Sequence, residues 1–269
     1  MLHTPNQSRS SSQTAQPAQA ALFVSDVHLQ EAMPRTTEAF LAFLRTQAAG
    51  AQRLYLLGDL FEYWAGDDDI EALFNRTVVD EIRRVSDTGT QVFWIAGNRD
   101  FLVGDRFARM AGVTLLSDPH VETFNGQRVT LTHGDAQCTD DLAYMKFRAE
   151  VRQPEWQRSF LAMPLEQRKR IIAELRAGSR EAQRAKSYEI MDVNNAAIDS
   201  LFDASAATLM IHGHTHRPAR HVHSGNGQDR IRYVLPDWDC DMQPIRGGWL
   251  AIGLDGVVRR FGVDGTALD

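Results

Sequence analysis

Five short apolar segments each end in a cluster of polar residues, and this repeated pattern constrains the fold more than any other feature of the chain. The segments are 21–25, 53–57, 92–97, 128–132 and 207–211, and the clusters read DVH, GD, GNRD, HGD and HGHTH. Helix-like stretches at 37–50 and 70–89 separate the first three segments, an alternation typical of parallel α/β units. Because functional groups collect at the carboxyl ends of parallel strands, we expect the clusters to converge at one edge.

Two later segments predict hairpins. Residues 121–132 and 251–262 are apolar runs interrupted by Asn-Gly and Asp-Gly, dipeptides that favour type I′ turns between antiparallel strands. We therefore expect an α/β protein with mixed sheets, in which parallel units come first and hairpins follow.

Residues 140–200 break the strand rhythm with a long helical stretch, which we interpret as an inserted cap. Residues 140–190 hold 11 basic and 8 acidic residues, a local charge of +3. Since the whole chain has a net charge of −6, the remaining residues together carry −9. A basic cap over an acidic core suits an anionic substrate, although a solvated charged face is the usual reason for such counts. The expected organisation is a disordered tail at 1–20, a core in two parts at 21–139 and 201–269, and the cap between them.

Composition excludes several classes of protein. No apolar run approaches the roughly 20 residues of a membrane-spanning helix, and a net charge of −6 argues against nucleic acid as a partner. The chain has two cysteines in 269 residues and begins with no leader-like segment, so we expect a cytoplasmic protein without disulfides. Nothing in the sequence indicates an obligate protein partner.

The polar clusters supply oxygen and nitrogen ligands suited to metal ions. They are Asp26, His28, Asp59, Asn98, His133, His214 and His216. Each follows a predicted strand and none is a thiolate, which favours hard or borderline divalent cations. Seven ligands are too many for one ion but fit two ions if a carboxylate bridges them, as in two-metal hydrolysis.

The motifs DVH, GD, GN, H and GHTH, in this order, resemble those of the calcineurin-like metallophosphoesterases over roughly residues 21–261. The resemblance implies an αββα sandwich of two mixed sheets, into which the helical cap is inserted. It also implies two ligand sets that share Asp59 as a bridge. The first set is Asp26, His28, Asp59 and His216, and the second is Asp59, Asn98, His133 and His214.

One position departs from that family's pattern. The family usually carries a histidine after the Asn of its GN motif, as general acid or transition-state stabiliser, whereas this chain carries Arg99. Because arginine stays protonated and cannot donate a proton, we expect Arg99 to clamp phosphoryl oxygens as they gain charge. Asn98 and His214 are expected to complete the catalytic groups.

Longer strings narrow the resemblance. SDVHL, GDLFEYWAGDDD, GNRDFL, HGDAQCTDDLAY, IHGHTHRP and, in the cap, RAGSREAQRAKS and MDVN are similar to bacterial UDP-2,3-diacylglucosamine diphosphatases of lipid A biosynthesis. That family splits a pyrophosphate and releases UMP and 2,3-diacylglucosamine 1-phosphate (lipid X). Its pattern implies a substrate site of Asn98, Arg99, Asp141, Ser179, Gln183, Lys186 and His214. The family often has asparagine where this chain has Gln183, a longer amide.

The resemblance also implies Mn²⁺ as the metal and a membrane-bound substrate. Two acyl chains keep such a substrate in the bilayer, so we expect peripheral docking at the cytoplasmic face of the inner membrane. The basic residues of the cap, among them Arg168, Lys169 and Arg170, are expected to meet anionic lipid. Its apolar residues, such as Phe160 and Leu161, offer a place for acyl chains or pack within the cap.

Two other interpretations stay open. Another calcineurin-like phosphoesterase, such as a dinucleoside polyphosphate hydrolase or a nuclease, would share the ligands, but the cap strings and GNRDFL count against it. A non-catalytic scaffold is disfavoured because all the ligands are present. Of the remaining histidines, His212 is expected in the core, whereas His120, His221 and His223 are expected to be exposed.

Overall fold

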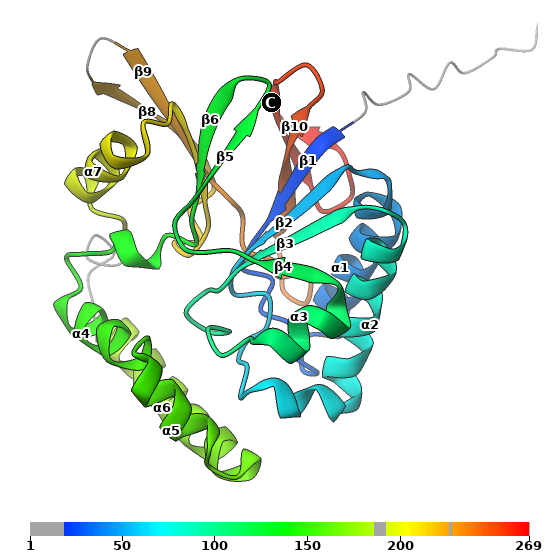
Figure 1. The fold of residues 1–269 in the computed structure, drawn as a ribbon, viewed down its shortest axis with the longest axis vertical. Coiled ribbons are helices and arrows are strands. Elements are labelled where there is room, and N and C mark those ends of the chain that lie inside the picture. The colour runs from blue at the N-terminus through cyan, green and yellow to red at the C-terminus, as the bar shows by residue number, and fades with distance from the viewer. Residues whose placement is uncertain (1–18, 186–191, 226–227, 269) are drawn as a thin grey trace, which may run out of the picture.

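The computed structural model describes residues 19–185, 192–225 and 228–268, and for residues 19, 179–185, 225 and 228 it describes the backbone alone. Two β-sheets pack face to face, and helices cover their outer sides (Figure 1). The predicted α/β sandwich with mixed sheets is confirmed.

The larger sheet has the strand order β12-β11-β10-β1-β2-β3-β4. Its strands are β1 (Gln19–Val24), β2 (Arg53–Leu57), β3 (Gln91–Ile95), β4 (Val113–Leu115), β10 (Gly248–Gly253), β11 (Val258–Gly262) and β12 (Ala267–Leu268). Strands β1 to β4 run parallel, as the alternation with helices predicts, and β10 is antiparallel to β1. The first strand starts two residues before the expected core boundary at residue 21, and tail residues 1–18 lie outside the described residues.

Helices between the parallel strands cover the outer face of the larger sheet. They are α1 (Pro34–Thr46), α2 (Leu73–Asp87) and α3 (Asp105–Ala111), with 3₁₀ turns η1 (Ala48–Gly50) and η2 (Asp67–Glu71). The first begins three residues before the predicted start at residue 37, because the fixed φ of Pro34 suits the first helical position. The second stops before Gly89, whose φ of 97° is easily adopted only by glycine.

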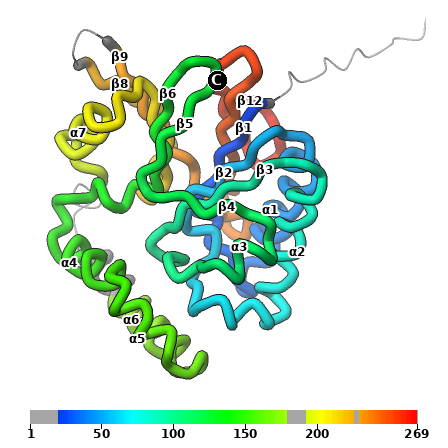
Figure 2. The backbone as a smooth tube through the Cα atoms, viewed as in Figure 1, coloured from blue at the N-terminus to red at the C-terminus, as the bar shows by residue number. Residues whose placement is uncertain are grey.

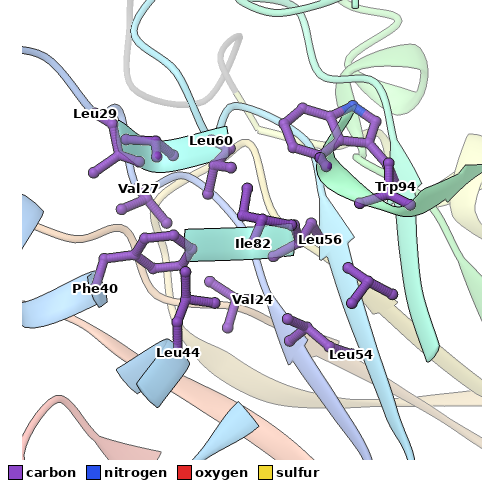
Figure 3. Packing of buried hydrophobic residues seen from close by; sticks show 14 of the residues in the cluster. Val24, Val27, Leu29, Phe40, Leu44, Leu54, Leu56, Leu60, Ile82 and Trp94 are labelled. Carbon is purple, nitrogen blue, oxygen red and sulfur yellow. The ribbon is translucent and has the colours of Figure 1, made fainter. Parts of the chain in front are cut away.

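Alternate residues of the parallel strands point into different cores. In β1, Leu22 and Val24 pack under the helices with side chains such as Ile82 of α2 (Figure 3). Ala21 and Phe23 face the other way and pack between the two sheets. This period of two buries β1 on both faces and fixes where its polar carboxyl end emerges.

The smaller sheet has the order β5-β6-β7-β9-β8. Its strands are β5 (His120–Phe124), β6 (Gln127–Leu131), β7 (Leu209–His212), β8 (Ala219–Gly225) and β9 (Gln228–Val234). After β6, the short turn η3 (Asp135–Gln137) leads toward the cap. The outer face is covered by α7 (Asn195–Ser205), whose Ile198 and Phe202 pack with Met210.

Both predicted hairpins are present. The β5–β6 turn has positive φ at Asn125 and Gly126, as a type I′ turn requires. The β10–β11 connection is longer, at 254–257, and only Gly256 in it has positive φ, so the expected type I′ turn is wrong there. The Asp255 carboxylate accepts the Val257 N–H at 3.0 Å and closes this loop instead.

The cap consists of α4 (Leu142–Val151), α5 (Pro154–Leu161) and α6 (Leu165–Ala185), which run together beyond the end of the sheets (Figure 2). We use the name cap for these helices only, because α7 packs on the smaller sheet. Among the described helices, none has the length and apolar content to cross a bilayer.

The cap is fastened to the core by residues that we expected to meet lipid. Arg168 is 2% exposed and donates to the Ala65 carbonyl and the Asp68 carboxylate, while Lys169 lies 2.6 Å from Asp69. These two side chains therefore face the core, and of the expected basic trio Arg170 alone is exposed.

The histidines that were not predicted as ligands divide differently from our expectation. His212 is fully buried, as predicted. His120, His221 and His223 lie on the edge strands β5 and β8 but are partly buried rather than exposed. The burial of His223 is explained by helix α7. Asp199 of this helix lies 3.4 Å from the His223 ring, and the His223 side chain is 12% exposed.

Candidate dinuclear metal centre

The polar clusters follow the carboxyl ends of β1, β2, β3, β6 and β7, so they gather at one edge shared by both sheets (Figure 1). Backbone hydrogen bonds join neighbouring loops there: Asp26 N–H donates to Gly58 and His28 N–H to Asp59, both at 3.0 Å. The predicted convergence of the five clusters is confirmed.

Left-handed backbone conformations are concentrated in this loop cluster. They occur, with φ between 53° and 68°, at Asp26, His28, Asp59, His214 and His216. In the described part of the chain, the other non-glycine residues with positive φ are Asn125 and Ala206. Such conformations cost on the order of 1 kcal/mol or more each and persist where the surrounding structure enforces them, often at functional sites.

Asp26, His28 and His216 form what we call the first cluster, with one donor atom of each within 4.8 Å of the others. The Nε2 atoms of His28 and His216 are 3.1 Å apart, and Nε2 of His216 lies 3.4 Å from Oδ1 of Asp26. This oxygen is buried and has no hydrogen-bond partner among the described residues. Three electron-pair donors thus face one another, an arrangement that fits a divalent cation.

The remaining oxygen of Asp26 is fully engaged. Oδ2 accepts hydrogen bonds from Ser25 Oγ at 2.5 Å and from the His214 N–H at 2.9 Å. Burial would raise the pKa of Asp26, but the neighbouring imidazoles of His216, His133 and His28 outweigh it and hold the pKa far below its usual value. The carboxylate is therefore ionised, as a metal ligand must be.

Asp59, His133 and His214 form the second cluster, with the Asn98 amide between the two imidazoles. Oδ1 of Asn98 lies 3.0 Å from Nε2 of His133 and 2.9 Å from Nδ1 of His214. His133 Nδ1 lies 2.9 Å from the Leu57 carbonyl and donates to it, so Nε2 is the nitrogen that faces Asn98. A cation held there would displace any proton on Nε2, because a metal-binding imidazole must be neutral.

Carboxylates make the second cluster attractive to positive charge. Burial would lower the pKa of His133, but Asp59, Asp26 and Asp135 raise it to about 9. Burial and the charge of His133 lower the pKa of His214 to about 4, so that imidazole is neutral at pH 7. Asp59 also adjoins the first cluster, because its backbone carbonyl accepts the His28 N–H at 3.0 Å.

Asp100, the last residue of the GNRD string, supports the centre and was not among our predicted site residues. Its buried carboxylate accepts the N–H groups of Asp59, Leu60 and Gly97 at 3.2, 2.8 and 2.8 Å. Burial and the charge of Asp59 raise the pKa of Asp100 to about 6. Gly97 lets the loops approach this closely, because a Cβ there would lie 2.1 Å from Oδ1 of Asp59.

Tyr144 of α4 connects the cap to the second cluster and was also missed. Its hydroxyl donates to the buried Asp135 carboxylate at 2.6 Å, and its ring lies 6.0 Å from that of His214. Asp141, an expected substrate contact, is the N-cap of the same helix and accepts the Tyr144 N–H at 3.1 Å. The DLAY part of the HGDAQCTDDLAY string contains the tyrosine, but nothing in its pattern distinguishes it.

A cavity of about 600 Å³ lies between the core and the cap. Asn98 and Arg99 line it, and Nε of Arg99 is buried without a hydrogen-bond partner among the described residues. Most of its other walls are aromatic or aliphatic: Trp64, Phe101, Leu102, Phe147, Trp156, Phe160, Ile171, Ile172 and Leu175.

Three other expected substrate residues come shortly after Gly178, which is the last described residue along the chain that lines this cavity. Ser179 and Gln183 lie in α6, where the structure describes only the backbone, and Lys186 lies outside the described residues.

The fold and its two ligand clusters define a metallophosphoesterase, and the family model of the calcineurin-like phosphoesterases matches residues 21–218. The chain is 49% identical over 243 residues to UDP-2,3-diacylglucosamine hydrolase of Aromatoleum aromaticum, covering 90% of this chain and 98% of the relative. It is 49% identical over 227 residues to the protein of the same name from Escherichia coli O7:K1, covering 84% and 94%. The chain belongs to the UDP-2,3-diacylglucosamine hydrolases within the calcineurin-like phosphoesterases.

Among solved structures, the Escherichia coli phosphoesterase Yfce is similar, with a TM-score of 0.44 and 16% identity over 93% of this chain and 96% of that one. Membership of the family implies divalent metal ions, and the two clusters are places where the described residues could hold them.

Proposed function

We propose that the protein hydrolyses the pyrophosphate bond of UDP-2,3-diacylglucosamine to UMP and 2,3-diacylglucosamine 1-phosphate. The observation that carries the proposal is the cavity, because it joins the polar residues Asn98 and Arg99 to a wide apolar space under the cap. A diacylated sugar nucleotide needs both environments, whereas a dinucleoside polyphosphate or a nucleic acid has no acyl chain to bury. The name of the 49% identical relatives supports the same substrate.

The proposed ligand sets divide the clusters between two divalent ions. Asp26, His28 and His216 would hold one, Asn98, His133 and His214 the other, and Asp59 would bridge them. When bound, the ions activate water near neutral pH and neutralise phosphoryl charge. The mixed oxygen and nitrogen ligands suit several first-row metals, and we propose Mn²⁺ on the resemblance described above.

The chain's own residues bind the substrate and stabilise charge. Arg99 lines the cavity beside Asn98, where its guanidinium can donate to phosphoryl oxygens as they gain charge. His214, with its neutral imidazole, lies against the same amide. We further propose that Asp141, Ser179, Gln183 and Lys186 contact the substrate headgroup.

A direct assay tests the proposal. Purified protein with Mn²⁺ and UDP-2,3-diacylglucosamine should release UMP, and chelation of the metal should abolish the release. UDP-glucosamine is the matched control, since it has the same pyrophosphate but no acyl chains, and it should be cleaved far more slowly. Faster cleavage of a dinucleoside polyphosphate than of the diacylated substrate would contradict the proposal.

We also propose that the protein works at the cytoplasmic face of the inner membrane, docking peripherally through its cap. The cap exposes apolar Leu142 and Phe147 and basic Lys146 and Arg170. Each basic residue near an anionic surface contributes about 1 kcal/mol of attraction. Co-sedimentation with phosphatidylglycerol vesicles should therefore fall with salt and in the Lys146→Glu/Arg170→Glu variant. If the protein binds phosphatidylcholine vesicles as strongly as phosphatidylglycerol vesicles, and salt does not change this binding, acyl-chain capture is left as the means of attachment.

A further inference from the structure

The carboxylate of Glu62 lies between the first cluster and the cap. Its Oε2 is 2.9 Å from Nδ1 of His28, and its Oε1 accepts from Nη2 of Arg176 in α6. The side chains of Glu62 and Arg176 are largely buried, with 16% and 19% of their surface exposed, and both line the cavity. One carboxylate therefore contacts a residue of the first cluster with one oxygen and the cap with the other.

An acceptor on the far nitrogen of a metal-binding imidazole sets the tautomer and orientation of the ring and raises its basicity. Nδ1 of His28 is buried, and Glu62 is near it, although the ring N–H does not point directly at the oxygen. When Nδ1–H of His28 donates to Glu62, Nε2 is left as an electron-pair donor on the side of His216, 3.1 Å away.

We propose that Glu62 is a positioning residue through which the cap sets the affinity of the first cluster for its divalent ion, with Arg176 as the anchor on the cap. The guanidinium of Arg176 also lies over the Tyr63 ring, 5.7 Å from its centre, which restricts how it can move. The inference rests on the metal-dependent hydrolysis proposed above. It implies that a displacement of α6 weakens metal binding, and reciprocally that bound metal stabilises the observed position of the cap.

The other imidazole of the first cluster also faces a carboxylate, at a longer distance and without involving the cap. Oδ2 of Asp237 lies 3.7 Å from Nδ1 of His216 and 3.1 Å from Nε of Arg246. Both of these residues belong to the core, between β9 and β10. The first cluster is thus supported by one carboxylate held by the core and one held by the cap.

A further cap contact provides the matched control. Asp68, six residues after Glu62, also pairs with a cap arginine, Arg168, but contacts no residue of either cluster in the described part of the chain. Asp68→Asn therefore removes the same chemical group from the same segment and the same kind of ion pair. It tests for loosening of the cap without a change in the support of His28.

The experiment is titration of the metal-stripped full-length protein with Mn²⁺, followed by calorimetry and by the electron paramagnetic resonance signal of free Mn²⁺. Glu62→Gln should weaken one of the two sites about 10–100-fold and leave the other unchanged, the range seen when such an outer support of a metal ligand is removed. Arg176→Ala should weaken the same site less, because the carboxylate remains, and Arg176→Lys should recover part of the loss. Asp68→Asn should bind both ions normally.

Turnover provides a second measurement. In Glu62→Gln the Mn²⁺ concentration for half-maximal activity should rise by the same 10–100-fold, whereas kcat at saturating Mn²⁺ should largely recover. A purely structural role would instead lower kcat at every metal concentration, and that result would overturn the inference.

The remaining outcomes separate this inference from the proposed function. Two normal sites in both Glu62→Gln and Arg176→Ala would overturn it and leave the hydrolase proposal intact. If Glu62→Gln loses Mn²⁺ affinity but Arg176→Ala does not, the role of the cap is overturned. The same holds if Asp68→Asn loses as much Mn²⁺ affinity as Glu62→Gln. Wild-type protein that binds no divalent ion would overturn the proposed function itself.

Discussion

The two ligand clusters contain similar residues but are held in different ways. In the first cluster, His28 and His216 are partly exposed, at 13% and 40%, and their outer nitrogens face carboxylate side chains. In the second, His133 is fully buried and its outer nitrogen donates to a backbone carbonyl. Side chains can shift with the segments that carry them, whereas a strand carbonyl cannot. We therefore expect the second cluster to be rigid and the first to respond to its surroundings.

Asp59 is the residue that unites the clusters, so its loss should have the largest effect. Asp59→Ala removes the proposed bridge and also the Oδ1 acceptor of the Arg99 N–H, which lies at 2.8 Å. We expect turnover to fall on the order of 10⁴-fold, as when a central member of a catalytic unit is removed. Metal content should fall below one ion per chain. Retention of two ions with normal turnover would show that the clusters bind metal independently.

Arg99 should matter for the reaction without mattering for either cluster. Arg99→Ala should lower kcat by about 10²–10³-fold, as when a donor to transition-state charge is lost, while both ions stay bound. Arg99→Lys should recover only part of the rate, because a lysine cannot donate through a planar fork. A near-normal kcat in Arg99→Ala would refute this role, and metal analysis of the same preparation serves as the control.

Single histidine variants should separate the two clusters. His28→Ala and His133→Ala should each retain about one ion per chain, measured by elemental analysis. They should differ in stability, because His133→Ala leaves the buried Leu57 carbonyl without its partner, a loss of about 1–3 kcal/mol in the free energy of unfolding. His28 is nearer the surface, and its replacement should change stability less. Equal destabilisation in chemical denaturation would contradict the proposed difference in rigidity.

The parts of this centre that the sequence predicts are those carried by a periodic pattern. Each predicted ligand follows an apolar run that alternates between two buried faces, so the position of the run also fixes the position of the ligand. The supporting acids carry no such signal. Glu62 and Asp237 lie in irregular segments, and their partners His28 and His216 are distant in sequence, so only the folded chain brings them together.

The packing of the cap is another feature that the sequence does not predict. Helical content between residues 140 and 200 follows from the sequence, but the surface on which each helix packs does not. Arg168 looked like a lipid-facing charge, yet it is buried against Asp68 because the apolar face of α6 turns toward the core. A count of charges cannot distinguish a residue that faces solvent from one that closes an interface.

The smallest expected effect on metal binding concerns the contact of the second cluster with the cap. Tyr144 reaches this cluster through its ring, stacked near His214, and its hydroxyl bonds to Asp135, which Arg148 also holds at 2.8 Å. Tyr144→Phe keeps the ring and removes one hydrogen bond to a charged group, about 1.5–3 kcal/mol of stability. Because the remaining contacts still fix His214, Mn²⁺ affinity should stay unchanged at both sites, in contrast to Glu62→Gln. A metal titration of this variant that showed a weakened site would mean that the second cluster also senses the cap, and that the two clusters do not differ in rigidity.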